Sequence, residues 1–228
     1  MSDVIVSLKN IGLSYRKKRS FFRHSFHAAL KDVSFDIYRG ETVGIIGRNG
    51  SGKSTLLKVL SGIYKPDTGV IDNRSRKTSL LTLQAGFDDN LSGRDNALLS
   101  GMLLGYGKEE ILSNMANIEV YSELGKFFHE PMKSYSTGMR ARLGFATLAF
   151  LTPEVLLLDE ILGVGDNKFR EKSSKTMADM ISSDNTVVLV SHSAPTVLGL
   201  CSRVIWIEEG MVRQQGDPKE VVSAYQAA

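Results

Sequence analysis

The stretch Gly47–Thr55, GRNGSGKST, fits the pattern G-x-x-x-x-G-K-[ST] of phosphate-binding loops. It follows the β-branched run ETVGII (41–46) and precedes apolar residues at helical spacing from Leu56 to Leu60, which predicts a strand before it and a helix after it. Glycines let the backbone curl until successive N–H groups point at phosphate oxygens, and the start of a helix adds a positive dipole. The sequence therefore predicts a nucleoside triphosphate site made of Gly47, Arg48, Asn49, Gly50, Ser51, Gly52, Lys53, Ser54 and Thr55.

A second chemical feature is the run VLLLDE (155–160), which ends in the carboxylates of Asp159 and Glu160. Open α/β sheets bind their ligands at the carboxyl ends of the strands, where these two side chains would lie. We expect Lys53 to reach the β- and γ-phosphates, and Ser54 and Asp159 to hold Mg²⁺. Glu160 is the candidate general base for the attacking water. Taken alone, such a run fits an ordinary strand end equally well, but its place about a hundred residues after the loop favours the site.

Apolar runs without alternation recur along the chain and predict strands that are covered on both faces. Helical patterns separate these runs, so we predict an α/β fold of the P-loop type with a mainly parallel sheet. Two leading strands, Val4–Leu8 and one with alternation from Leu30 to Ile37, are expected to be antiparallel. The expected buried strands are SLLTL (79–83), EVLLLD (154–159) and TVVLVS (186–191).

The middle and the end of the chain differ from this pattern. Residues 93 to 150 contain almost no β-branched runs and predict successive helices, so we expect an inserted helical subdomain of about residues 88–150. RVIWIEEGMVRQQG (203–216) predicts two strands with a turn at Glu209–Gly210. DPKEVVSAYQ predicts a helix that Asp217 caps and Pro218 begins.

Composition and charge exclude several classes of protein. The lone Cys201 cannot form an internal disulfide, which excludes a disulfide-stapled secreted fold. The longest apolar stretch, Leu143 to Leu151, is too short to span a bilayer, and the N-terminus does not resemble a signal peptide. The formal net charge of +3 hides a split, because residues 1–31 carry seven basic residues against Asp3 alone. A basic segment of this kind favours an acidic partner near one end of the chain.

The segment SYSTGMRARLGFATLAF (134–150) has no counterpart in kinases, GTPases or helicases. Ser136 is placed to cap a helix, and Gly138 keeps the first turn free of side chains. A helix start of this kind can bind a second anion. A well-capped core helix explains the same residues equally well.

Together these motifs resemble the nucleotide-binding subunit of ATP-binding-cassette (ABC) transporters over essentially the whole chain, residues 1–228, as a single domain. The resemblance matches Ser136, Thr137, Gly138 and Met139 to the signature that completes the ATP site of the opposite protomer in a homodimer. It matches Tyr15 to the residue that stacks on adenine, Gln84 to a ligand of Mg²⁺ and sensor of the γ-phosphate, and Asp166 to the end of the loop at the dimer contact. It also implies that Glu160 and His192 are catalytic.

Within that family the segments YSTGMRARLGFA, LSGRDNALLSG and DEILGVGD resemble ATPases that export capsular polysaccharide, O-antigen or teichoic acid. The implied function is ATP hydrolysis that drives export of a polysaccharide or lipid-linked glycan through a separate integral-membrane subunit. The implied place is the cytoplasmic face of the inner membrane. Some such proteins carry a C-terminal carbohydrate-binding domain, and we expect none here.

Three other functions are less well supported. A small-molecule kinase would have no use for the helix start at Ser136. ABC ATPases that act on nucleic acid separate the two motifs by long coiled coils, whereas Lys53 and Ser136 are 83 residues apart, so we expect no nucleic-acid partner. An importer or drug-exporter subunit remains an alternative.

The basic segment 16–27 is interpreted in two ways. It is either a solvated loop or a surface that meets lipid headgroups or the pyrophosphate of a lipid-linked glycan. His24, His27 and His129 lack a comparable motif and are predicted to be surface or packing residues.

Overall fold

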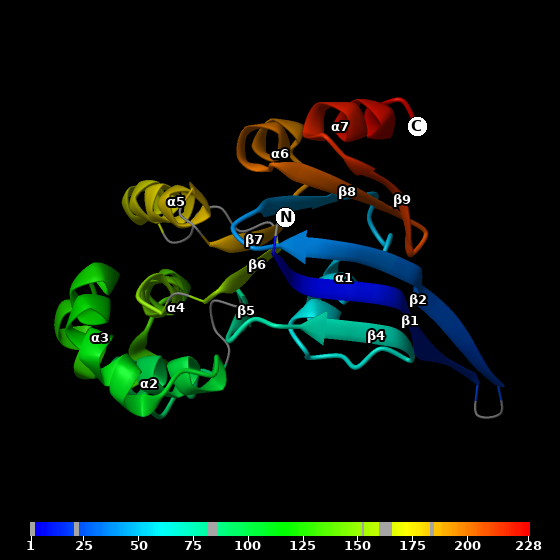
Figure 1. The fold of residues 1–228 in the computed structure, drawn as a ribbon. Coiled ribbons are helices and arrows are strands. Elements are labelled where there is room, and N and C mark those ends of the chain that lie inside the picture. The colour runs from blue at the N-terminus through cyan, green and yellow to red at the C-terminus, as the bar shows by residue number, and fades with distance from the viewer. Residues whose placement is uncertain (1–2, 21–22, 82–85, 152, 160–165, 183–184) are drawn as a thin grey trace. The chain divides into compact units, whose positions relative to one another are not determined.

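The computed structural model describes all residues except 1–2, 21–22, 82–85, 152, 160–165 and 183–184 (Figure 1). The chain divides into two compact units. The first comprises Met1–Leu80, Glu154–Glu160 and Ile181–Ala228, and the second comprises Leu81–Pro153 and Ile161–Met180. The phosphate loop therefore lies in the first unit and the segment around Ser136 in the second.

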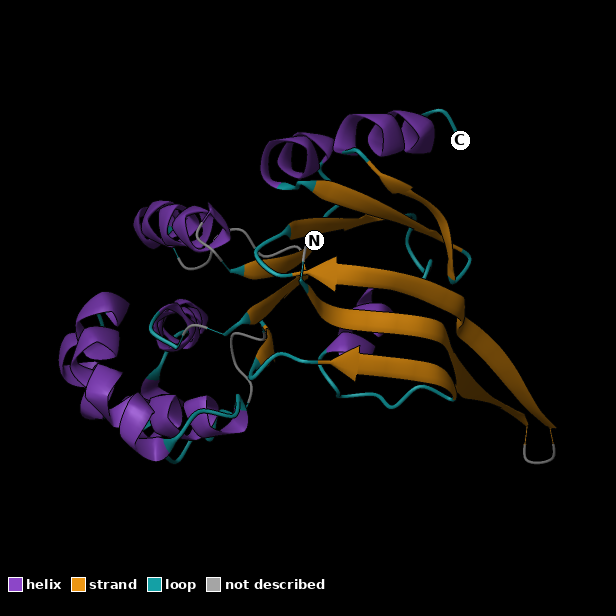
Figure 2. Cartoon of the chain, in the orientation of Figure 1, coloured by secondary structure: helices purple, strands orange, loops and turns teal. Residues whose placement is uncertain are grey.

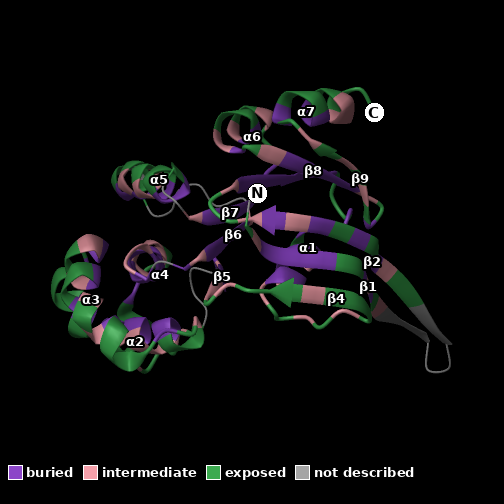
Figure 3. Ribbon diagram, in the orientation of Figure 1, coloured by how far each residue is buried: buried purple, intermediate pink, exposed green. Residues whose placement is uncertain are grey.

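The first unit contains a six-stranded sheet. Its strands are β3 (Thr42–Ile46), β5 (Thr78–Leu80), β6 (Val155–Asp159), β7 (Thr186–Val190), β8 (Arg203–Glu208) and β9 (Met211–Gly216). They run in the order β5-β6-β7-β3-β8-β9, and all neighbours are parallel except β8 and β9 (Figure 2). The central strands are buried along almost their whole length (Figure 3), which confirms the predicted, mainly parallel sheet.

A second, antiparallel sheet in the same unit has the order β2-β1-β4. It is made of β1 (Val4–Ser20), β2 (Arg23–Tyr38) and β4 (Thr68–Asn73). The predicted antiparallel leading strands are confirmed, but the prediction of a loop across residues 16–27 is wrong. β1 and β2 form one long hairpin in which Arg16 pairs with Phe26 and Ser20 with Arg23. Five of the twelve residues 16–27 are Lys or Arg, and the segment lacks the apolar alternation by which sequence analysis detects a strand. The two strands are instead recognised by their backbone pairing.

The three helices described in the first unit are α1 (Lys53–Leu60), α6 (Ala194–Leu200) and α7 (Pro218–Gln226). As predicted, Asp217 caps α7, and its carboxylate accepts hydrogen bonds from the backbone N–H groups of Lys219 and Glu220. One core joins the antiparallel sheet, the strands of the six-stranded sheet and the buried face of α1. This shared core fixes the phosphate loop, because the loop connects β3 to α1.

The second unit is helical, as predicted for residues 93 to 150. Its helices are α2 (Gly93–Leu103), α3 (Lys108–Ser122), α4 (Thr137–Ala149) and α5 (Asn167–Ser182), the last of which reaches its boundary. Short 3₁₀ turns at Gly125–His129 and Met132–Ser134 precede α4. Fully buried Ile111, Phe128 and Leu143 pack in a separate core of this unit.

In the part of the chain that the structure describes, we find no helix with the length and hydropathy needed to cross a membrane.

A largely buried ion pair ties the start of β3 to β8. The Arg203 guanidinium donates to both carboxylate oxygens of Glu41, at 3.1 and 2.7 Å, and to the carbonyl of Asp36. The two side chains are 20% and 13% exposed. We expect Glu41→Gln to lower the free energy of unfolding by about 2 kcal/mol, because it leaves a buried guanidinium without its counter-charge. Urea denaturation of the purified chain measures this.

The matched control is Glu208→Gln. Glu208 faces Arg213 at 3.7 Å, and these side chains are 34% and 66% exposed, so the change should stay within about 0.5 kcal/mol. An equal decrease in the free energy of unfolding in Glu41→Gln and Glu208→Gln would contradict a structural role for the Arg203–Glu41 pair.

Candidate functional site

The phosphate loop has a shape that only glycine permits at two positions. Gly47 has φ 151° and Gly52 has φ 110°. A Cβ atom at Gly47 would lie 2.1 Å from the carbonyl oxygen of Ile207, and one at Gly52 would lie 2.5 Å from that of Ala29. Both contacts are with backbone carbonyl oxygens, which cannot move away by a side-chain rotation. The loop is therefore held between β8 and β2.

The Lys53 side chain folds back against the backbone of the phosphate loop. It is buried, and its ammonium group donates to the carbonyl oxygens of Gly47 at 2.8 Å and Arg48 at 3.0 Å. The same residue begins α1, so the positive charge lies at the start of the helix. An ammonium group and a helix N-terminus in one place attract anions.

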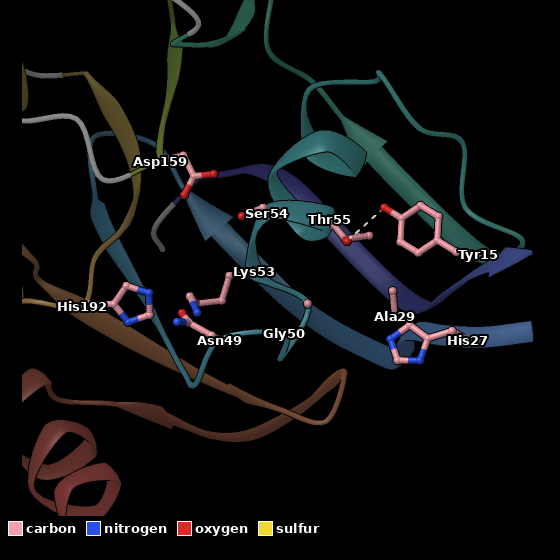
Figure 4. A pocket seen from close by; sticks show the side chains of 11 residues that line it. Tyr15, His27, Ala29, Asn49, Gly50, Lys53, Ser54, Thr55, Asp159 and His192 are labelled. Atoms are coloured by element: carbon pink, nitrogen blue, oxygen red, sulfur yellow. Dashed lines mark hydrogen bonds between the residues drawn. The ribbon is translucent and has the colours of Figure 1, made fainter. Parts of the chain in front are cut away.

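A cavity of about 540 Å³ opens beside the loop, within the range of small-molecule sites. Asp159 ends β6, and His192 follows β7. These two strands are parallel neighbours, so their carboxyl ends lie at the same edge of the sheet. Both side chains therefore reach the cavity beside the β3–α1 loop. Figure 4 shows the side chains arranged around this space. The residues that line it are Tyr15, His27, Ala29, Asn49, Gly50, Gly52, Lys53, Ser54, Thr55, Asp159 and His192.

Most of the predicted nucleotide residues described in the first unit thus meet at one cavity. Gly47, Arg48 and Ser51 belong to the loop but do not line the cavity. Ser51 is buried, and its N–H donates to the carbonyl of Arg48 at 3.1 Å. Glu160 and Gln84 lie outside the described residues.

An aromatic residue lies at the other end of the cavity from Lys53. The Tyr15 hydroxyl is 3.1 Å from Oγ1 of Thr55, and its ring packs edge-on against Tyr64 with centroids 5.9 Å apart. His27 lies across the β1–β2 ladder from Tyr15 and also lines the cavity. His27 is exposed, as predicted, but no motif in the sequence revealed its place at the cavity.

The signature residues form a separate helix start in the second unit. Ser136 is the N-cap of α4, and its Oγ accepts a hydrogen bond from the N–H of Met139 at 3.2 Å, which confirms the predicted cap. Thr137 is the first helical residue and is exposed, and Gly138 follows it. A Cβ atom at Gly138 would meet nothing closer than 3.8 Å, so the space in front of this helix start is open.

Asp166 shares a cavity of about 340 Å³ with this helix start. Its carboxylate accepts from the backbone N–H of Phe169 at 3.1 Å and from the guanidinium of Arg142, which also lies 5.2 Å from the Phe169 ring. The Phe169 hydrogen bond, and after it Arg142, lower the pKa of the Asp166 carboxyl. Asp166 is therefore ionised at neutral pH and links α4 to the start of α5.

Comparison with known proteins agrees with this geometry. A family model described as ABC transporter matches residues 30–163. The chain is 45% identical to an O-antigen export system ATP-binding protein of Myxococcus xanthus, over 93% of this chain and 49% of that protein. A protein of the same description from Klebsiella pneumoniae is 39% identical, over 95% of this chain and 89% of that protein.

A solved structure gives the same result for the fold. A dimeric ATP-binding cassette in a post-hydrolysis state, bound to ADP and Pi, superposes with a TM-score of 0.72 at 25% identity, over 93% of this chain and 98% of that one. This confirms the predicted ABC ATPase fold. The chain spans about half the length of the Myxococcus relative and most of the Klebsiella one. Its sequence, fold and phosphate-loop cavity agree, and the chain belongs to the ABC transporter family.

Proposed function

We propose that this chain is an ATPase subunit that powers export of a polysaccharide or lipid-linked glycan through a separate transmembrane partner. The observation that carries the proposal is the single cavity bordered by the phosphate loop, Asp159 and His192. The O-antigen export relatives support the direction of transport and the class of cargo. No feature of the described residues favours an importer or a drug exporter.

The nucleotide is bound by its phosphates at the loop. Lys53 supplies a fixed positive charge, and the N–H groups of the loop and of the first turn of α1 donate to phosphate oxygens. The donors present also suit Mg²⁺, because the Ser54 hydroxyl and the half-buried Asp159 carboxylate both line the cavity. There these two residues, with Gln84, would hold the ion, which supplies charge neutralisation to the phosphates.

Hydrolysis requires a group that accepts a proton from the attacking water. Glu160 directly follows Asp159 in the sequence, and Asp159 ends β6 and lines the cavity. In this proposal Glu160 is that base, and His192 holds the water and the γ-phosphate from the end of β7.

The signature is proposed to act in trans within a homodimer. Ser136, Thr137, Gly138 and Met139 surround an open helix start, which suits the γ-phosphate of ATP bound to a second copy. Asp166 would lie at the same contact between the two copies. The solved cassette that this chain resembles is dimeric and bound to ADP and Pi, which supports a homodimer.

The long β1–β2 hairpin is the proposed contact with the membrane. Arg16, Lys17, Lys18 and Arg19 lie near the end of β1, and Arg23 begins β2. A cluster of basic residues attracts anionic lipid headgroups by about 1 kcal/mol for each residue near the surface. The same charges suit the pyrophosphate of a lipid-linked glycan. This surface and the transmembrane partner would keep the chain at the cytoplasmic face of the inner membrane.

Glu160→Gln is the direct test of hydrolysis. It should lower the turnover number by about 10²–10⁴-fold while MgATP still binds, because only the general base is lost. Size-exclusion chromatography should find a dimer of this variant with ATP and a monomer without it. The matched control is Lys53→Ala, which should weaken ATP binding itself. Wild-type turnover in Glu160→Gln would contradict the assignment.

The hairpin contact can be tested with lipid vesicles. Replacing Lys17, Lys18 and Arg19 with Gln should weaken binding to vesicles that contain phosphatidylglycerol by at least tenfold, since three charges are lost. Binding to neutral phosphatidylcholine vesicles should not change. The matched control removes three exposed lysines of the second unit, Lys108, Lys126 and Lys133. An equal loss in both triple variants would mean that only net charge matters and would contradict the proposed surface.

A further inference from the structure

β1 and β2 pair irregularly beside the nucleotide cavity. Leu13 pairs with Leu30, and Tyr15 pairs with His27. A step of two residues along β1 therefore corresponds to a step of three along β2. The register shift that separates these pairs is a β-bulge, which inserts one extra residue into β2.

The bulge decides which side chain faces the cavity. Residues two apart on a strand share a face, so Leu13 and Tyr15 lie on the same side of β1. Directly paired residues of two strands also share a face. In regular pairing Ala28 would stand opposite Tyr15, but the extra residue brings His27 there instead.

The cavity confirms this placement. His27 and Ala29 both line it together with Tyr15 and Thr55. In Figure 4, Tyr15, Ala29 and His27 lie at one end of the cavity, and Lys53, Asn49 and His192 lie at the other. Because Lys53 and the start of α1 attract phosphates, the nucleoside part of a bound nucleotide extends toward the end that holds Tyr15 and His27.

We propose that His27 is a nucleotide-contacting residue that holds the nucleoside part of ATP together with Tyr15. The inference rests on the proposed binding of ATP. An imidazole ring has a flat face and two nitrogens that can donate or accept hydrogen bonds, which suits a base edge or a ribose hydroxyl. The exposed ring of His27 is accessible to such a ligand. Tyr15 thus provides one wall of the nucleoside end, and His27 provides the second.

Two ligands separate this role from a role in phosphate binding. Isothermal titration calorimetry should measure MgATP and inorganic tripolyphosphate, which has no nucleoside, on the wild type and on His27→Ala. We expect the Kd of MgATP to rise about three- to tenfold, the effect of one lost hydrogen bond, and that of tripolyphosphate to stay unchanged. His27→Gln keeps a hydrogen-bonding group and should lie closer to the wild type.

The matched control is His129→Ala. His129 is also an exposed histidine, but it pairs with Glu119 at 3.0 Å in the second unit, so its loss should leave both affinities unchanged. An unchanged Kd of MgATP in His27→Ala would overturn the inference. Equal weakening of MgATP and tripolyphosphate would also overturn it, since His27 would then act through the phosphate loop. A wild type that binds neither ligand would overturn the proposed function instead.

Discussion

The close approach of the phosphate loop to two backbone carbonyls is the constraint on which the site depends. Gly47 lies against Ile207 of β8, and Gly52 lies against Ala29 of β2, so the loop touches both sheets of the first unit. Any side chain at either position would force backbone to move. A loop held on both sides keeps its N–H groups directed before a phosphate arrives, and such preorganisation lowers the cost of binding.

The same constraint explains why distant parts of the chain meet at one cavity. Parallel strands carry their carboxyl ends to one edge, which brings Asp159 and His192 to the loop after β3. The antiparallel sheet adds Tyr15 and His27 to the same cavity, and Ala29 of β2 lies directly against Gly52 of the loop. Each sheet therefore lies at a different end of the cavity: the six-stranded sheet borders the end proposed for the phosphates, and the antiparallel sheet borders the end proposed for the nucleoside.

Sequence patterns predicted the parts of this molecule that depend on local spacing. The apolar runs of β3, β6 and β7, the caps at Ser136 and Asp217, and the phosphate loop each carry their signal within a few residues. β4 gave no signal, because TGVIDN is mostly exposed and only Ile71 is half-buried. The end of the β1–β2 hairpin, where Arg16 pairs with Phe26 and Ser20 with Arg23, also gave no strand pattern in the sequence. Its strands are paired through backbone hydrogen bonds, which do not depend on alternating apolar residues. The place of His27 at the cavity could not be predicted from the sequence, because a bulge between two paired strands determines which face of the sheet its side chain lies on.

The central claim, that an ATP site is completed by the signature of a second copy, can be tested by a cross-link. In the double variant Asn49→Cys/Ser136→Cys, one new thiol lines the nucleotide cavity and the other caps α4. Burial raises the pKa of the native Cys201 thiol to about 12, so it contributes little thiolate near neutral pH. Under mild oxidation, the account predicts a disulfide-linked dimer on non-reducing gels with MgATP and only monomer without it. A variant that binds MgATP yet stays monomeric would contradict the account.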